Sequence, residues 1–174
     1  MKSKRIHLRP IAIKDTKIYY ESTQSEEIMY MTGTQQTFTF EQIEEHIKTI
    51  IVDDSREDYA ICFNKTNEMV GELSIMDIDK RNSAAAFRIS MNSTKYTGIG
   101  LGSEAIDLIV DYVFNSLNLN RLQLEVYSHN PRGIRAYEKA GFIKEGVLRE
   151  KLLYNGKYSD EIIMSILKKD YNNQ

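Results

Sequence analysis

Three glycines at alternate positions, Gly98, Gly100 and Gly102, lead directly into an amphipathic helix. The helix is predicted to about Ser116 because its apolar residues recur on one face: Ile106, Ile109, Val110, Val113, Phe114 and Leu117. Glycine tolerates positive φ and leaves the backbone N–H groups unscreened by a Cβ. The first N–H groups of a helix lack intrahelical partners and lie at the positive end of its dipole. The sequence therefore predicts a phosphate or pyrophosphate site. The alternative is a plain helix-entry loop, for which one glycine would suffice.

The composition is that of one globular domain. The chain has 174 residues, 41% of them hydrophobic, which is enough for a core of its own. A net charge of −2 gives no overall attraction for nucleic acid, and no apolar run approaches the ~20 residues of a membrane span. The single cysteine, Cys62, lies in an apolar run and is expected to be a small buried residue rather than a catalytic thiol. We expect a cytoplasmic protein without nucleic-acid or membrane partners.

The pattern along the chain predicts an α+β fold with a mixed, mainly antiparallel sheet. Strands are expected near residues 6–9, 58–63, 69–78, 84–91 and 121–126, and on both sides of a type I′ hairpin turn at Asn155-Gly156. Short polar turns between the second, third and fourth strands imply an antiparallel meander. The helix after the glycine loop instead implies a parallel crossover between residues 84–91 and 121–126.

Three more helices are predicted, near residues 15–25, after residue 39, and from Asn130-Pro131 to Gly141. Thr39 and Gln42 form a capping box, and Phe38 is placed to pack on Ile43 as a hydrophobic staple. The apolar face of that helix is expected to consist of Ile43, Ile47, Ile50 and Ile51. Residues 31–37 are expected to form a loop.

Several familiar catalytic motifs are absent from the sequence. It has no HExxH, paired CxxC, GxSxG or P-loop lysine, and its three histidines show no metal-ligand spacing: His7, His46 and His129. Gly100-x-Gly102-x-x-Ala105, with Glu125 as a ribose acid, matches a loosened dinucleotide fingerprint. That fingerprint needs a buried strand running straight into the first glycine. The polar connector at residues 92–97 therefore disfavours a dinucleotide site.

A second informative stretch runs from Asn130 to Phe142. Asn130 and Tyr137 are two helical turns apart, so both face the same side. Together with the glycine loop, this stretch resembles the GNAT acetyltransferase family, which has Arg/Gln-x-x-Gly-x-Gly/Ala before a long helix and later Asn-x-x-Ala-x-x-x-Tyr-x-Lys-x-Gly-Phe. The matching residues are Thr97, Gly100, Gly102, Asn130, Gly133, Tyr137, Lys139, Gly141 and Phe142. The resemblance also includes residues 8–10 and 154–158, and it is strongest to spermidine and ribosomal-protein N-terminal acetyltransferases.

The resemblance implies an enzyme that binds acetyl-CoA and acetylates an amine, without a metal. It implies that the strand before the loop offers backbone groups to the pantetheine arm, at Ile89, Ser90 and Met91. It further implies that loop amides hold the pyrophosphate, at Thr97, Gly98, Ile99, Gly100, Leu101, Gly102 and Ser103. Asn130 is expected to contact the CoA arm. Tyr137 is expected to lie near the thioester and to protonate the leaving thiolate.

Two residues depart from the family pattern. Thr97 stands where relatives carry Arg or Gln, and Lys95 is a candidate to replace the missing charge. Ala86 stands where many relatives carry a glutamate that acts as base. The base is then Glu72, Asp77, Glu125, a water chain or no dedicated group.

The residues favour direct attack of an amine in a ternary complex, since no activated nucleophile is visible. The alternative function is a non-catalytic CoA-binding sensor of the same fold. The acceptor is left open between a polyamine, another small-molecule amine and a protein N-terminus, and a homodimer is common among similar proteins. We expect residues 19–53 to select the acceptor. Their acids either attract a cationic acceptor or are solvated helix faces: Glu21, Glu26, Glu27, Glu41, Glu44 and Glu45.

Overall fold

The computed structural model describes residues 1–173 and contains seven strands and six α-helices. The strands are β1 (Ile6–Pro10), β2 (Glu57–Phe63), β3 (Met69–Asp79), β4 (Ala84–Met91), β5 (Arg121–Tyr127), β6 (Ile143–Tyr154) and β7 (Lys157–Leu167). The helices are α1 (Thr16–Thr23), α2 (Glu26–Thr32), α3 (Phe40–Ile50), α4 (Leu101–Asp111), α5 (Pro131–Lys139) and α6 (Lys168–Tyr171). A π-helical turn at Tyr112–Ser116 extends α4, and short 3₁₀ turns lie at Ile13–Asp15 and Thr94–Tyr96.

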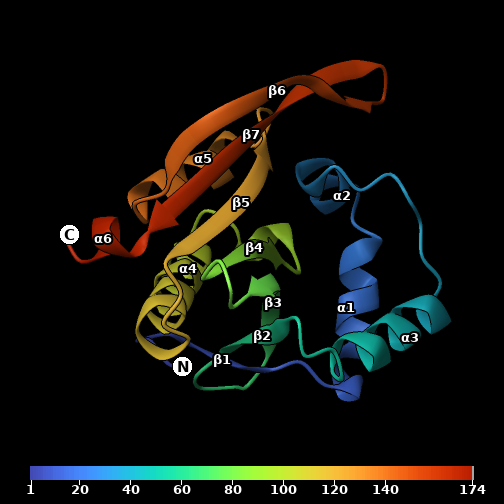
Figure 1. Cartoon of the computed structure of the whole chain (residues 1–174). Helices are drawn as coiled ribbons and strands as arrows, with labels where there is room; N and C mark the ends of the chain where they lie inside the picture. The colour runs from blue at the N-terminus through green and yellow to red at the C-terminus, as the bar shows by residue number, and fades with distance from the viewer. Residues whose placement is uncertain (174) are drawn as a thin grey trace.

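The strands form one sheet in the order β1-β2-β3-β4-β5-β7-β6 (Figure 1). Neighbouring strands are antiparallel except β4 and β5, which are parallel because α4 connects them. β4 and β5 pair only over residues 84–86 and 121–123. Beyond that point β4 stays with β3 as far as Met91, while β5 stays with β7 as far as Tyr127. The sheet therefore opens into a wedge between β4 and β5.

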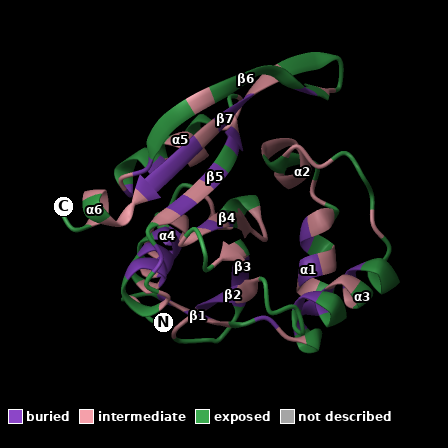
Figure 2. Cartoon of the chain, viewed as in Figure 1, coloured by how far each residue is buried: buried purple, intermediate pink, exposed green. Residues whose placement is uncertain are grey.

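Helices cover both faces of the sheet. α4 and α5 pack on one face, over a large core that includes Leu73 and Phe87. α1 and α3 pack on the other face, over a smaller core that includes Ala60 and Cys62. Figure 2 shows the buried side of α4 against the strands, whereas β6 is exposed along much of its length. None of the helices in residues 1–173 is both long and apolar enough to cross a bilayer.

Strand alternation decides which side chains face which helices. Successive side chains point to opposite faces, and residues paired across strands share a face. Ala60 pairs with Glu72, and Glu72 pairs with Ser90, so Glu72 and Ser90 lie on the α1 side of the sheet. Arg88, two residues before Ser90, lies on the same side. Ile89 and Met91 lie on the α4 side.

Most of the predicted elements, and the α+β fold class, are confirmed. The capping box of α3 is present: the Thr39 hydroxyl accepts from the Gln42 N–H, and the Gln42 side chain accepts from the Thr39 N–H. Asn155 and Gly156 both have positive φ, as a type I′ hairpin requires. Cys62 is fully buried. The parallel crossover from β4 through α4 to β5 is also present.

The predicted loop at residues 31–37 is wrong at its start, because α2 extends to Thr32. Ser25 caps α2 by accepting from the Ile28 N–H at 3.5 Å, and two glutamates occupy the first turn. Gly33, with φ of +70°, ends the helix. These cap signals are in the sequence, but α2 has only 7 residues, too few to show a repeating apolar stripe, and none of them is fully buried.

The predicted apolar face of α3 is wrong at Ile51. Ile43, Ile47 and Ile50 are buried, whereas Ile51 is 46% exposed. Ile51 is the C-cap residue, where the chain leaves the helical path and turns away from the sheet.

Gly71 marks a close approach between β3 and β4, and we predict that Gly71→Ala destabilises the fold. A Cβ at this position would lie 2.7 Å from the Ser90 carbonyl oxygen, a backbone atom that cannot rotate away. Overpacking of this kind costs about 1–3 kcal/mol in unfolding free energy, measurable by urea titration. Gly146→Ala is the matched control, because its Cβ would find its nearest neighbour 3.9 Å away. Equal midpoints for the two variants would contradict the prediction.

Candidate functional site

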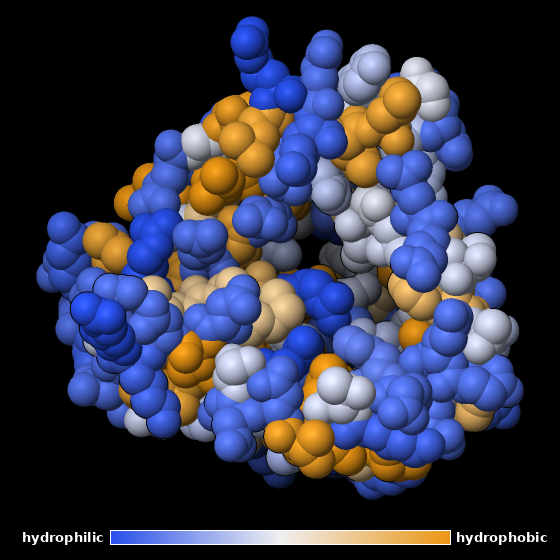
Figure 3. All heavy atoms as spheres, turned by 45° about the vertical axis from the view of Figure 1, so that its right-hand side comes forward, coloured by the Kyte–Doolittle hydropathy of each residue, from blue (hydrophilic) through white to orange (hydrophobic). Residues whose placement is uncertain are grey.

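A cavity of about 350 Å³, here called the wedge cavity, lies where β4 and β5 separate. Its walls come from the end of β4, the glycine loop, the start of α4, α5 and α2. Because β5 no longer pairs with β4 beyond Ala86, the later part of β4 presents a backbone edge to this space. A hollow is visible on the face of the molecule that Figure 3 shows.

The glycine loop has the backbone geometry expected of an anion site. Gly98 and Gly100 have φ of +74° and +85°, and Gly100 is the N-cap of α4. Gly102 is different, because it lies inside the first turn of α4 rather than in the loop. The loop therefore turns the first N–H groups of α4 toward the wedge cavity without a side chain in the way.

Arg5, near the N-terminus, holds the loop from outside. Its guanidinium donates to the Ile99 carbonyl at 2.8 Å and to Glu104 at 2.5 Å. The Ser3 hydroxyl also donates to Glu104, at 2.5 Å. Sequence reasoning missed this clamp, since its partners lie about a hundred residues apart and no local pattern connects them.

Ten of the twelve residues predicted for the cofactor line the wedge cavity: Ile89, Ser90, Met91, Thr97, Gly98, Gly100, Gly102, Ser103, Asn130 and Tyr137. The side chains of the other two do not. Ile99 is 51% exposed, and Leu101 is buried in the main core.

The suggestion that Lys95 replaces a missing positive charge is wrong in position. Its ammonium lies over the Tyr96 ring, 4.5 Å from the centroid, and it does not line the cavity. α5 contributes the basic residues instead: Arg132, Arg135 and Lys139 line the wedge cavity. The sequence contained this signal, because the three cations fall within two turns of the helix that Asn130 begins.

Asn130 and Tyr137 lie on the same side of α5, as their spacing predicted. The Asn130 side chain accepts from the Gly133 N–H at 2.9 Å, so it caps the helix while lining the cavity. The Tyr137 ring makes edge contacts with Phe87 and Phe142, with centroids 6.4 and 5.9 Å away. Burial raises the pKa of Tyr137 to about 12. Tyr137 thus packs on two aromatic rings while lining the cavity, and its phenol stays protonated at neutral pH.

A second cavity of about 440 Å³, here called the helical cavity, lies on the opposite face of the sheet, among α1, α2 and α3. Ile28 and Thr32 of α2 line both cavities, and so does Ser90 of β4. The two cavities therefore meet at the wedge, through the plane of the sheet.

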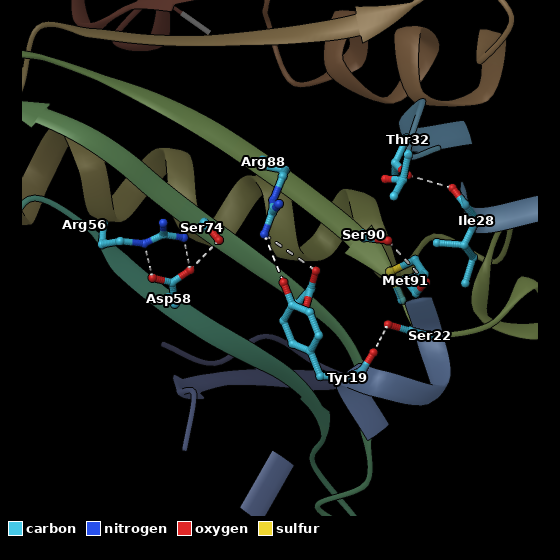
Figure 4. Close-up of polar contacts among 12 residues, drawn as sticks. Tyr19, Ser22, Ile28, Thr32, Arg56, Asp58, Ser74, Arg88, Ser90 and Met91 are labelled. Atoms are coloured by element: carbon cyan, nitrogen blue, oxygen red, sulfur yellow. Dashed lines mark hydrogen bonds and ion pairs between the residues drawn. The ribbon is translucent and has the colours of Figure 1, made fainter. Parts of the chain in front are cut away.

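Glu72 and Arg88 are the charged residues that line the helical cavity. Arg88 donates to the Tyr19 hydroxyl at 3.2 Å and lies 3.9 Å from Glu72 (Figure 4). Burial raises the pKa of Glu72 to about 7, although Arg88 opposes the shift. One Glu72 oxygen is buried without a hydrogen-bond partner among residues 1–173. This is the signature of a carboxylate that can exchange a proton near neutral pH.

The other two candidate bases are not in the site. Asp77 and Glu125 are exposed and line neither cavity. Few of the acids within residues 19–53 reach either cavity, which favours the alternative that they form solvated helix faces. Glu44 and Glu45 pair with Lys48, and of the six acids only Glu27 lines a cavity: Glu21, Glu26, Glu27, Glu41, Glu44 and Glu45. These acids cluster in sequence because amphipathic helices need solvated faces.

The described residues 1–173 contain no group of three or more His, Cys, Asp or Glu side chains placed to hold a metal ion.

Comparison with known proteins identifies the family. The sequence matches the acetyltransferase (GNAT) domain over residues 5–143, so the chain belongs to the GNAT acetyltransferase family. It is 27% identical over 170 residues to a spermidine N(1)-acetyltransferase of Vibrio cholerae, covering 98% of this chain and 97% of that protein. A spermidine N(1)-acetyltransferase of Escherichia coli K12 is 28% identical over 166 residues, covering 95% of this chain and 88% of that protein.

A solved structure extends the comparison to the fold. The Vibrio cholerae spermidine N-acetyltransferase, crystallised with CoA and spermine, matches with a TM-score of 0.89 and 27% identity. The match covers 97% of this chain and 98% of that chain. The present chain is thus an N-acetyltransferase that uses acetyl-CoA to acetylate an amine.

We predict that Gly100→Val weakens CoA binding at least about tenfold while the chain stays folded. A β-branched residue is strained at φ of +85°, and its Cβ would lie 3.0 Å from the Arg5 guanidinium, so the loop must shift. Titration calorimetry with CoA measures the effect, and Gly146→Ala on β6 is the control. Unchanged affinity would show that the loop does not hold the cofactor.

Proposed function

We propose that acetyl-CoA occupies the wedge cavity and that a primary amine reaches it from the helical cavity and attacks directly. The observation that carries this proposal is that Ser90, Ile28 and Thr32 line both cavities. Two substrates on opposite faces of the sheet can meet only there. Relatives are named for spermidine, so polyamines belong among the acceptors to be tested.

The residues of the wedge cavity fit acetyl-CoA. The loop at Gly98–Ser103 and the start of α4 offer N–H groups to a pyrophosphate, and three cations on α5 face the same space. The unpaired edge of β4 can hydrogen-bond the amides of an extended pantetheine arm, as an added strand would. Asn130 can bind the same arm from α5. When bound, acetyl-CoA supplies the activated acyl group.

The reaction also requires two proton transfers, one from the attacking amine and one to the leaving sulfur. We assign Glu72 to take the proton from the attacking amine, because it is the only one of the three candidate carboxylates that lines a cavity. We assign Tyr137 to return a proton to the leaving sulfur. Burial raises the pKa of Tyr137, which keeps the phenol protonated but makes it a weak acid. Its contribution to the rate should therefore be modest.

The direct test is release of free CoA thiol from acetyl-CoA in the presence of a panel of amines. We expect acceptor-dependent release that requires both substrates at once, with initial-rate kinetics of a ternary complex. If CoA binds but no amine is acetylated, the helical cavity is not an acceptor site.

We predict that Tyr137→Phe lowers kcat by about 10²-fold, at the low end for loss of a general acid. The ring contacts with Phe87 and Phe142 are kept, so melting temperature and CoA affinity should hardly change. Tyr158→Phe, on the exposed β7 hairpin, is the control. A near-normal kcat, where chemistry limits the rate, would assign Tyr137 to packing alone.

We predict opposite effects of Glu72→Gln on rate and stability. The wild-type kcat/KM should rise with pH to a plateau above about pH 7, where Glu72 is deprotonated. The variant should not show this rise with pH, and its rate should be roughly 10²–10⁴-fold lower than that of the wild type. Because the folded pKa is raised above the ordinary 4.5, burial of Glu72 costs stability as pH rises through 4.5 to 7.

Thermal melts at several pH values test the second part. The variant should gain melting temperature relative to wild type as pH rises across that window. A wild-type pH profile retained in the variant would exclude Glu72 as the base.

We further propose that residues 1–174 work as a single cytoplasmic domain and that the chain forms homodimers. The single sheet covered by helices on both faces supports the first proposal. Light scattering of the purified chain measures the oligomeric state.

A further inference from the structure

Arg88 has more hydrogen-bonding capacity than the protein uses. Its side chain is 47% exposed and lines the helical cavity. Within residues 1–173 it makes one hydrogen bond, to the Tyr19 hydroxyl, and its 3.9 Å separation from Glu72 is beyond hydrogen-bonding length. A guanidinium has five N–H donors in a fixed fork, so most of the fork remains available to a ligand.

Glu72 is the only carboxylate paired with Arg88 within residues 1–173, at 3.9 Å, and the other groups on this face add no free negative charge. Asp58, the next carboxylate along this face, is already held by two bonds from Arg56, each 2.7 Å, and by the Ser74 hydroxyl at 2.6 Å (Figure 4). Burial, together with Arg56 and Arg88, lowers the pKa of His46, which keeps its ring neutral. Tyr19 is also neutral, because burial raises its pKa.

This charge arrangement is poorly suited to a polyamine. A polyamine brings several ammonium groups, whereas the helical cavity offers them one carboxylate, Glu72, with Arg88 beside it. A second ammonium group would have to lie near Arg88 and be repelled. A carboxylate at that position would instead receive a charge-assisted, bidentate pair of hydrogen bonds.

We propose that the acceptor is a primary amine that also carries a carboxylate. The carboxylate binds Arg88, and the amine lies between Glu72 and Ser90, where the two cavities meet. Glu72 and Arg88 are neighbours, so the amine and carboxylate must be close in the covalent structure of the acceptor. A free amino acid or the N-terminal aspartyl or glutamyl residue of a peptide meets this requirement.

The inference rests on the proposed function and keeps its proton balance. The amine nitrogen forms the bond to the acetyl carbon as the carbon–sulfur bond breaks. One amine proton passes to Glu72, and Tyr137 supplies a proton to the sulfur. Arg88 takes part in none of these transfers, so it acts as a specificity-determining residue.

The test compares matched acceptors that differ only in the anionic group. Thiol release is measured with alanine and alaninamide, with a peptide amide that begins with Asp and its Asn counterpart, and with spermidine. We expect kcat/KM to favour one carboxylate-bearing member of a pair by roughly 10- to 100-fold, the effect of one charged hydrogen bond. The pair that shows the preference identifies the source of the acceptor.

Variants of Arg88 connect the preference to the residue. Arg88→Gln should abolish the preference in kcat/KM for the carboxylate-bearing acceptor of a pair, mainly through KM. Arg88→Lys should retain part of this preference. Arg81→Gln, in the exposed turn before β4, should leave the ratio unchanged. CoA affinity by calorimetry confirms that each variant is folded and loaded.

The outcomes separate this inference from the function on which it rests. Spermidine used as well as or better than every carboxylate-bearing amine would overturn the inference and leave the acetyltransferase proposal standing. A preference that survives Arg88→Gln would overturn the assignment to Arg88. No turnover with any acceptor, despite CoA binding, would overturn both.

Discussion

The loss of pairing between β4 and β5 is the constraint on which both cavities depend. Each strand is held on its other side by an antiparallel partner, so the two can separate without losing the sheet. An unpaired strand edge inside a folded chain is costly unless something hydrogen-bonds it. In this fold the edge faces a cavity of about 350 Å³. Under the proposed function this opening in the sheet is the binding site, and Ser90, Ile28 and Thr32 line the cavities on both of its faces.

The polar residues on the α1 face of the sheet are also explained by binding rather than by stability. A core built only for stability would place apolar side chains beneath α1 and α3, as the sheet does at Ala60 and Cys62. Beside them the sheet carries Glu72 and Arg88 instead. Burying a carboxylate without full hydrogen bonding costs folding free energy and raises its pKa. The unpartnered Glu72 oxygen shows that this cost is not fully offset within the protein.

How much could be predicted depended on whether the determining contacts are local. Residues adjacent in sequence determine three features that were predicted correctly: the cap of α3, the hairpin turn at Asn155 and the helix that Asn130 begins. The conformation of the glycine loop was also predictable, because glycine tolerates the positive φ found at Gly98 and Gly100. The Arg5 clamp and the closeness of Glu72 to Arg88 were not, since they arise from strand register between distant segments. Ala86 shows the limit: the missing glutamate was visible and Glu72 was one of three candidate carboxylates, but the sequence could not show that of the three only Glu72 lines a cavity.

α2 was the element that sequence reasoning missed, and it links the two sides of the wedge. Its residues line both cavities, yet it has no fully buried side chain to anchor it to the sheet. Its attachment is instead aromatic and polar. The Tyr30 ring stacks on His129 with centroids 4.1 Å apart, and His129 lies 2.6 Å from the Tyr30 carbonyl. Beyond the helix, Gly33 packs so closely on the Tyr127 ring that a Cβ would lie 2.3 Å from it.

These contacts attach α2 to the β5 side of the wedge, while its Ile28 and Thr32 face Ser90 on the β4 side. The only ion pair that α2 makes across the site within residues 1–173 joins Glu27 to Arg132 at 3.8 Å, and both side chains are too exposed for it to contribute much. The position of α2, and with it the passage between the cavities, therefore depends in part on ring stacking just beyond the end of β5. Under the proposed function, a substrate amine crosses this passage before it meets the acetyl group. Under the proposals made above, acceptor selection depends on two different physical features: the charge at Arg88 and the position of the short helix α2.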